Sequence, residues 1–212
     1  MIVSWKHVTR RVSIGLSAFM LMVFLAACGG GSTGSSTPTP TPPTPTPSPT
    51  TPSIAMQTFT GNGFTISYPQ SWQKSSSSSQ NTSQTVFQDT TTGNSFTIVS
   101  TPDPGGALSA DSLASTSSQA LLGSVLKNGK SENVPASVTI NGVTWSQRGA
   151  SGDATVNGQS VPAKLILLVT VHPPNATTSQ AFQLIYAGPA LTFDLISAQI
   201  FQPMLQSFKF TS

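Results

Sequence analysis

Few side chains in this chain of 212 residues could act as nucleophiles, bases or metal ligands. The chain contains one cysteine, Cys28, and two histidines, His7 and His172. A nucleophilic mechanism needs a base beside a serine or cysteine, and His172 is the only imidazole after Cys28. No feature of the sequence brings a carboxylate, such as Asp153 or Asp194, to this ring. His172, at the end of a buried strand, is a candidate base or binding residue, and otherwise an ordinary loop histidine.

The carboxylates are scattered and match no metal-binding loop. A single histidine argues against a transition-metal site, and a single cysteine excludes a thiolate cluster or a disulfide within the chain. A glycosidase-like pair of carboxylates finds no supporting motif either. The sequence therefore predicts no metal site, no cofactor and no catalytic centre. The acids considered as calcium ligands are Asp89, Asp103, Asp111 and Glu132.

The N-terminal segment has the layout of an export signal. A basic stretch, residues 1–11, precedes an apolar stretch, residues 12–27, which is shorter than the ~20 residues that a membrane-spanning helix needs. The segment Leu25-Ala26-Ala27-Cys28 resembles the lipobox of bacterial lipoproteins. This resemblance implies cleavage before Cys28 and attachment of lipid to its sulfur. The alternative is a buried thiol in an uncleaved anchor helix.

The positive charge of the chain belongs to that export signal. The formal net charge is +3, and three of the nine basic residues, Lys6, Arg10 and Arg11, precede residue 12. The other six basic residues balance the six acids. A protein that binds nucleic acid by neutralising phosphates needs a basic patch, so the sequence predicts no nucleic-acid partner.

A proline-rich segment follows the cysteine. Residues 29–53 contain no charged or aromatic side chain, and residues 37–52 nearly alternate Thr or Ser with Pro. Such a run favours extended polyproline II, and its sixteen residues would reach roughly 50 Å. We predict a signal peptide over 1–27, a lipidated cysteine and stalk over 28–53, and one globular domain over 54–212.

The sequence pattern of the domain predicts short strands and two helices. Asn141-Gly142 between two apolar runs is a strong hairpin signal, and the strand over 161–172 is apolar on both faces. A helix is expected over 109–127, with Ser109 as its N-cap and Asn128-Gly129 as its end. Other expected strands cover residues 64–68, 85–89, 95–99, 181–187 and 207–210.

Three further expectations complete the fold. The apolar stripe of the first helix is assigned to Leu113, Thr116, Ala120, Leu121 and Val125. A second helix is expected over 191–201, with Pro203 breaking or restarting it, and the serine-rich residues 75–84 are expected to form a polar loop. Together the elements predict an α+β fold, with a mainly antiparallel sheet and helices on both faces.

The two ends of the domain resemble a known family. The segment Gly63-Phe64-Thr65-Ile66-Ser67-Tyr68-Pro69-Gln70-Ser71-Trp72 resembles the opening of PsbP-like domains. The segment Phe201-Gln202-Pro203-Met204-Leu205-Gln206-Ser207-Phe208-Lys209-Phe210 is similar to their ending. This resemblance implies an α/β/α sandwich that serves as a binding or assembly factor, with no shared catalytic chemistry. It also places Trp72 in the core.

Two tryptophans remain as candidate binding residues. An exposed Trp72 or Trp145 could stack on sugars or on a protein partner, although packing in the core is the expected role of both. We therefore predict a lipid-anchored extracytoplasmic protein that binds or helps to assemble an unknown component of the cell envelope. The alternatives are a lipoprotein that binds a sugar or a metal ion, and an envelope hydrolase.

Overall fold

The computed structural model describes residues 54–79, 81–156 and 158–211. The predicted signal peptide and stalk lie outside the described residues, and so do Cys28 and its neighbours Leu25, Ala26 and Ala27. In the part of the chain that is described, no helix is long and apolar enough to cross a bilayer.

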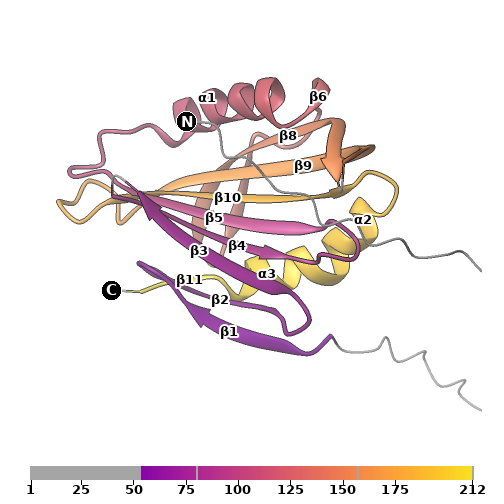
Figure 1. The fold of residues 1–212 in the computed structure, drawn as a ribbon. Coiled ribbons are helices and arrows are strands. Elements are labelled where there is room, and N and C mark those ends of the chain that lie inside the picture. Colours follow the sequence, from indigo (N-terminus) through magenta and orange to yellow (C-terminus); the bar gives the residue numbers. More distant parts are fainter. Residues whose placement is uncertain (1–53, 80, 157, 212) are drawn as a thin grey trace, which may run out of the picture. The chain divides into compact units, whose positions relative to one another are not determined.

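The larger of two sheets has eight strands, all paired in antiparallel fashion (Figure 1). Its strands run in the spatial order β3-β4-β5-β10-β9-β8-β6, and β7 pairs with a further part of β8. The strands are β3 (Gln73–Ser79), β4 (Thr82–Gln88), β5 (Ser95–Pro102), β6 (Lys127–Glu132), β7 (Ser137–Ile140), β8 (Val143–Val156), β9 (Gln159–His172) and β10 (Gln180–Pro189).

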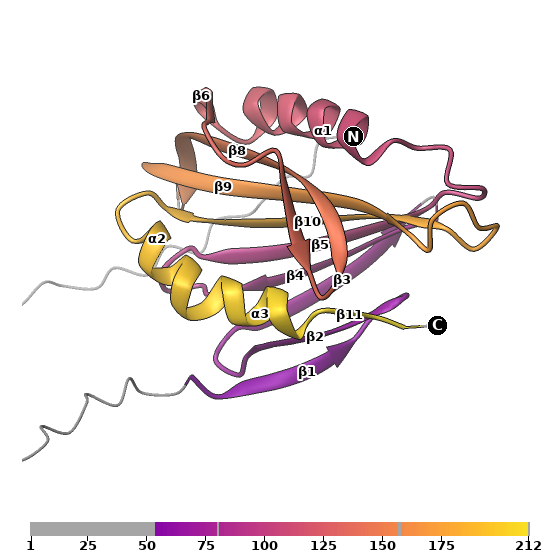
Figure 2. The same ribbon diagram turned by 180° about the vertical axis from the view of Figure 1, so that it is seen from behind.

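A smaller sheet and a helical segment lie on one side of the large sheet, and α1 (Ala110–Ser124) lies on the other (Figures 1 and 2). The predicted α+β class and the mainly antiparallel sheet are confirmed. The sequence did not predict that the layer opposite α1 combines helix with a second sheet. The small sheet contains β1 (Met56–Thr60), β2 (Phe64–Pro69) and β11 (Lys209–Phe210), and the helical segment contains α2 (Phe193–Ile196), η1 (Ser197–Phe201) and α3 (Gln202–Ser207).

The hairpin predicted from Asn141-Gly142 is confirmed. Both residues have positive φ, 49° and 81°, as a two-residue type I′ turn requires. Ile140 pairs with Val143 across the turn. The Asn141 side chain donates hydrogen bonds to the carbonyls of Gln206 and Phe208, at 3.0 and 2.7 Å. The turn is therefore fixed to the C-terminal segment as well as closing its own hairpin.

Strand β9 is covered on both faces, as its unbroken apolar run predicted. Leu168 is fully buried in the aromatic core between the large sheet and the layer of β2, η1 and α3. Leu167 and Val169 are fully buried against Ala114 of α1 on the other face. Because side chains alternate along a strand, apolar residues of both parities are needed only where both faces are covered.

Helix α1 begins as predicted but ends earlier and buries a different stripe. The Ser109 side chain accepts a hydrogen bond from the Ser112 N–H, which satisfies one free donor of the first turn. The helix ends at Ser124, and Asn128-Gly129 lies within β6, so the predicted closing signal is wrong. The small residues Ala114 and Ser118 face the sheet, one turn apart.

The predicted stripe was therefore partly wrong. Leu113 and Leu121 pack on the sheet, but Thr116, Ala120 and Val125 are exposed. A helix that buries Ala114 and Ser118 approaches the sheet closely, which rotates the larger apolar residues toward the flanks of the contact.

The serine-rich segment is not a loop. Ser75 to Ser79 belong to β3, which pairs with β4 over seven residues without interruption. Asn81 has a positive φ of 65° in the turn between the two strands. The pairing with β4 supplies backbone hydrogen bonds that override the low strand propensity of serine. Strand β4 is itself fixed by the buried Phe87.

The C-terminal helical segment is longer than predicted. It runs from Phe193 through a π-helical turn, η1, to Ser207, and Pro203 lies at the start of α3. A proline in a helix interior removes a backbone donor and crowds the preceding turn. The wider π-helical turn before it accommodates the ring, so the helix continues past Pro203.

Candidate functional site

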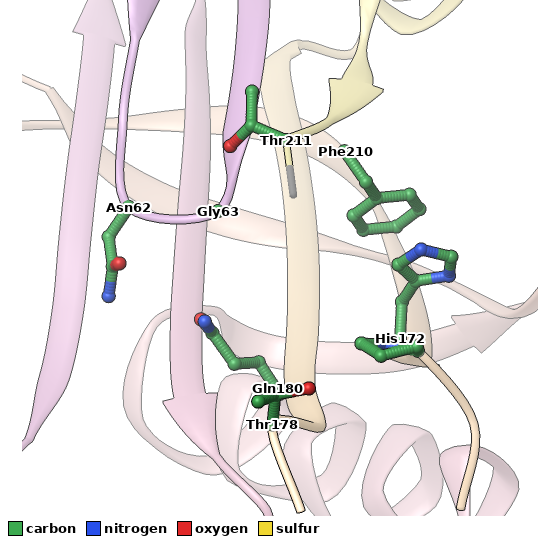
Figure 3. A pocket seen from close by; sticks show the side chains of 8 residues that line it. Asn62, Gly63, His172, Thr178, Gln180, Phe210 and Thr211 are labelled. Atoms are coloured by element: carbon green, nitrogen blue, oxygen red, sulfur yellow. The ribbon is translucent and has the colours of Figure 1, made fainter. Parts of the chain in front are cut away.

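A cleft of about 680 Å³ lies at one end of the large sheet. Four segments meet there: the end of β9, the start of β10, the turn between β1 and β2, and the C-terminal β11 (Figure 3). The residues that line the cleft are Asn62, Gly63, His172, Pro173, Thr178, Gln180, Phe210 and Thr211.

Strand pairing fixes each of the two sides of the cleft. On one side, Phe210 pairs with Phe64, and the Thr211 N–H donates to the Gly63 carbonyl at 3.0 Å. On the other side, Gln180 pairs with His172 as the first pair between β10 and β9.

Glycine is required where the small sheet meets Gln180. Gly63 has a φ of +79°, a backbone conformation that side chains disfavour. A Cβ atom built there would lie 3.2 Å from the Phe182 ring and 3.3 Å from the Gln180 Nε2 atom. The close approach of the turn thus packs the backbone of Gly63 directly against the amide of Gln180 (Figure 3).

The His172 ring stacks on an aromatic side chain. Its centroid lies 3.9 Å from that of Phe210, with the planes 14° apart. Phe210 in turn stacks on the buried Trp145, at 5.9 Å and 10°. Phe182 meets Phe210 edge-on at 5.0 Å. The imidazole therefore ends a set of stacked rings that connects the cleft to the core.

The setting of His172 favours the neutral form of its ring. Burial lowers the pKa of His172 from its usual value of 6.5, because desolvation disfavours the imidazolium form. Neither Asp153 nor Asp194, the carboxylates considered beside it from the sequence, contacts the ring. Asp153 accepts a hydrogen bond from Asn128, and Asp194 pairs with Lys164 at 3.6 Å.

In the part of the chain that the structure describes, the cleft wall has no Asp, Glu, Lys or Arg and carries hydrogen-bonding groups. Asn62 and Gln180 contribute amides, and Thr178 and Thr211 contribute hydroxyls. The Gln180 Oε1 atom is buried and has no hydrogen-bond partner among the described residues. Such a wall can hold a neutral polar molecule, and its described residues include no carboxylate to hold a cation or to accept a proton from His172.

The loop between β9 and β10 is held by its own hydrogen bonds. The buried Ser179 hydroxyl donates to the Pro173 carbonyl at 2.5 Å and accepts from the Ala176 N–H at 3.0 Å. The Ser179 carbonyl accepts from the Asp103 N–H at 2.8 Å. The loop therefore presents Thr178 to the cleft from a fixed backbone.

The four acids considered as calcium ligands lie in separate structural roles. The buried Asp103 carboxylate accepts from the N–H groups of Ala107 and Leu108, both at 3.1 Å. Asp111 pairs with Arg148 at 2.6 Å, and Glu132 accepts from the Ser151 hydroxyl. The described residues contain no cluster of three or more His, Cys, Asp or Glu side chains.

Asp89 fixes the turn that follows β4. Burial acts to raise the pKa of this carboxyl, but hydrogen bonds from the side chains and backbone of Thr91 and Thr92 outweigh it, and the pKa is lowered. The Thr91 and Thr92 hydroxyls donate to Asp89 at 2.6 and 2.7 Å. All the oxygen-ligand candidates thus already have local partners.

Neither tryptophan is presented to a ligand. Trp72 is 5% exposed and meets Phe201 edge-on at 6.0 Å, and Trp145 is fully buried. Trp145 nevertheless contributes to the site indirectly, since it stacks under Phe210. Of the three candidate binding residues from the sequence, the structure brings only His172 into a cleft.

The other lining residues were not found from the sequence. Asn62, Gln180 and Phe210 lie in three segments that are distant along the chain. No motif links them, because antiparallel pairing and the docking of β11 bring them together only in the fold. The Asn62-Gly63 turn and the strand ends beside it were the signals present in the sequence.

Comparisons with known proteins identify no family for this chain. No protein-family model and no curated protein matches the chain. Among solved structures, it is similar to the crystal structure of LpqN, involved in cell envelope biogenesis of Mycobacterium tuberculosis. The two chains are 11% identical, with a TM-score of 0.42 over 75% of this chain and 92% of LpqN. A similarity at this level transfers neither fold nor function. The resemblance to PsbP-like domains is not confirmed by these comparisons.

Proposed function

We propose that this chain is a lipid-anchored extracytoplasmic protein of the cell envelope, held through Cys28 and carried on a proline-rich stalk. The order of segments supports this proposal: a basic stretch, a short apolar stretch, Leu25-Ala26-Ala27-Cys28, and then a stalk without charged residues. Several acyl chains on one lipoprotein anchor give stable membrane attachment, whereas a single chain holds only marginally.

The domain acts as a non-catalytic binding or assembly factor, with the cleft as its binding site. One observation carries this part of the proposal. The imidazole of His172 is stacked on Phe210, and none of the described residues that line the cleft with it is an Asp or Glu. Acid–base catalysis by histidine needs a partner that orients the ring and a proton path to the substrate. The site instead offers an aromatic surface and fixed amides, which suit recognition.

The PsbP-like interpretation belongs to this proposal. A sandwich of that kind used for binding or assembly agrees with a site built from strand ends and the C-terminal strand, since both resembling segments contribute to it. Gly63 begins the first segment and Phe210 ends the second.

A small-molecule ligand is the second candidate, and the lining of the cleft favours a sugar over a metal ion. Amide and hydroxyl groups beside an aromatic ring match the hydroxyls and apolar faces of a sugar. A divalent cation requires several oxygen ligands, commonly carboxylates, and the residues that the structure describes around this cleft include no Asp or Glu.

Membrane attachment is tested on the full chain by fractionation. We expect wild type in the membrane fraction, carrying a labelled fatty acid, and expect Cys28→Ala to lose the label. Ser32→Ala, a nearby change that spares the cysteine, is the matched control. A Cys28→Ala chain that still carried the label would contradict the anchor.

The ligand candidate is tested by thermal shift on the full chain, with neutral sugars and divalent cations as probes. A ligand that binds the folded state raises the melting temperature as its concentration increases. Thr178→Tyr, an exposed change in the cleft, should remove a shift seen with wild type. Ser160→Tyr, an exposed change outside the cleft, should keep it. A shift that survives Thr178→Tyr would place the ligand elsewhere.

A further inference from the structure

The two edges of the large sheet differ in how they are protected against strand pairing. The edge strand β6 carries Lys127, Lys130 and Glu132, and its pairing with β8 shifts register between Lys127 and Lys130. Charges and irregular pairing are the features by which natural sheets keep other strands from joining an edge. Strand β6 is therefore a protected edge.

The opposite edge strand, β3, lacks these features. It pairs with β4 without a register shift, contains no proline, and has one charge, Lys74, near its beginning. All seven of its residues are exposed. Within the described residues β3 has a neighbour on one side only. Its outer backbone N–H and C=O groups are thus available to a further strand.

The side chains of β3 also permit close approach. Five consecutive serines occupy residues 75–79, and none is large enough to keep a partner strand away. We propose that β3 pairs with β3 of a second copy of this chain, in antiparallel orientation about Ser77, so that two large sheets join into one. This proposal concerns a different surface from the cleft and does not rest on the proposed function.

The charge of Lys74 favours antiparallel over parallel pairing of the two β3 strands. In an in-register parallel pair, Lys74 of each copy would face the other at roughly 5 Å, the spacing between neighbouring strands. In an antiparallel pair about Ser77 the two lysines are six positions apart, or about 20 Å at ~3.3 Å per residue. That separation exceeds the ~8 Å over which salt screens charges at physiological ionic strength. An antiparallel pair is also isologous and closes as a dimer instead of growing into a fibre.

Cysteine crosslinking of the full chain in detergent tests the arrangement. Residues directly opposite across antiparallel strands have Cβ atoms ~4.5–5.5 Å apart, near enough for a disulfide after slight adjustment. Under mild oxidation we expect Ser77→Cys to give about ten times more crosslinked dimer than Ser131→Cys, an exposed serine on β6. Cys28 is kept in every variant, and the wild-type chain shows how much crosslinked dimer arises from Cys28 itself.

Mixtures of two differently tagged variants test the orientation. Ser75→Cys mixed with Ser79→Cys should crosslink to each other more than either does to itself, because antiparallel pairing about Ser77 places residue 75 opposite residue 79. Equal self-crosslinking at all five serines would indicate parallel pairing and overturn the proposal. Crosslinking of Ser77→Cys no greater than that of Ser131→Cys would overturn it as well.

A charge variant provides an independent measurement. Ser77→Lys places a like charge opposite itself on an exposed strand, so sedimentation should show a monomer where wild type forms a dimer. A Ser77→Lys chain that remained as dimeric as wild type, or a wild-type chain that stayed monomeric at every concentration, would contradict the proposal.

Discussion

The two faces of the large sheet are packed with different kinds of side chain. The face toward β2 and α3 is built from buried aromatic rings of β4, β5, β8 and β10: Phe87, Phe96, Trp145, Phe182 and Tyr186. The face under α1 is built from small and aliphatic residues, with Ala114 against Leu167 and Val169 and with Ala150, Ala163 and Leu165 around Leu126. The cleft lies at the end of the aromatic face, where stacked rings reach the surface at Phe210 and His172.

The two kinds of packing differ in what they contribute to the candidate site. A row of rings held by edge and stacked contacts fixes the position of the last ring, and in this protein the last ring, His172, lines the cleft. The packing of α1 on small and aliphatic residues positions no aromatic ring at the cleft in this way. We therefore expect the aromatic face to determine both stability and binding, and the α1 face to contribute stability alone.

The largest expected effect is at Trp145. Trp145→Ala removes a fully buried ring that stacks on Phe210 and meets Phe208 edge-on. It should lower the free energy of unfolding by about 3–5 kcal/mol, measured by chemical denaturation. Trp145→Phe, which keeps an aromatic ring under Phe210, should lose clearly less. Equal losses in the two variants would show that the ring stack does not govern stability.

A smaller effect is expected on the α1 face. Leu167→Ala should lower the free energy of unfolding by about 2–3 kcal/mol, near the bottom of the usual range for a buried leucine, because α1 can settle onto the gap. Ligand or partner binding at the cleft should be unchanged. A loss as large as that of Trp145→Ala would remove the distinction between the two faces.

Loss of the N-cap of α1 should lower the stability less than either of the two core substitutions. Ser109→Ala removes the acceptor for the Ser112 N–H, and a lost N-cap costs about 1 kcal/mol. Ser109→Asp keeps an acceptor at the same position and should retain the stability of wild type in the same denaturation experiment. A full loss in Ser109→Asp would mean that the cap is not the reason for the effect.

The smallest effect concerns pH. The folded pKa of His172 lies below 6.5, so on acidification the unfolded state takes up its proton first. Stability should therefore fall slightly as the pH drops below about 7, and this loss stops once the pH is below the folded pKa. Unfolding measured between pH 7.5 and 5.5 should show this slope in wild type and a flatter slope in His172→Gln. Identical slopes would show that His172 titrates alike in both states.

The sequence predicts best where structure is local. Asn141-Gly142 determines its turn through the backbone preferences of these two residues. The unbroken apolar run of β9 likewise indicates that both faces of this strand are covered. The serine-rich β3 was mistaken for a loop because its strand structure depends on pairing with β4, not on its own residues. The stripe of α1 was misplaced because the buried face is chosen by contact with the sheet at Ala114 and Ser118.

The candidate site was predictable only in part. His172 stood out as the single imidazole after Cys28, whereas Phe210 and Gln180 carry no chemical signal of their own. The role of Phe210 arises from the pairing of β11 with β2, which joins residues from opposite ends of the domain. Gln180 is placed opposite His172 by the pairing of β10 with β9. Long-range pairing of this kind is not encoded in spacing along the chain.

Crosslinking capture in intact cells tests the central claim, that the cleft is the binding site of an envelope-anchored binding protein. The full chain is compared with two of its exposed-site variants, Thr178→Tyr in the cleft and Ser160→Tyr outside it. We predict that wild type and Ser160→Tyr capture the same envelope component, and that Thr178→Tyr captures less than a tenth as much at equal membrane abundance. Equal capture by all three chains would contradict the account.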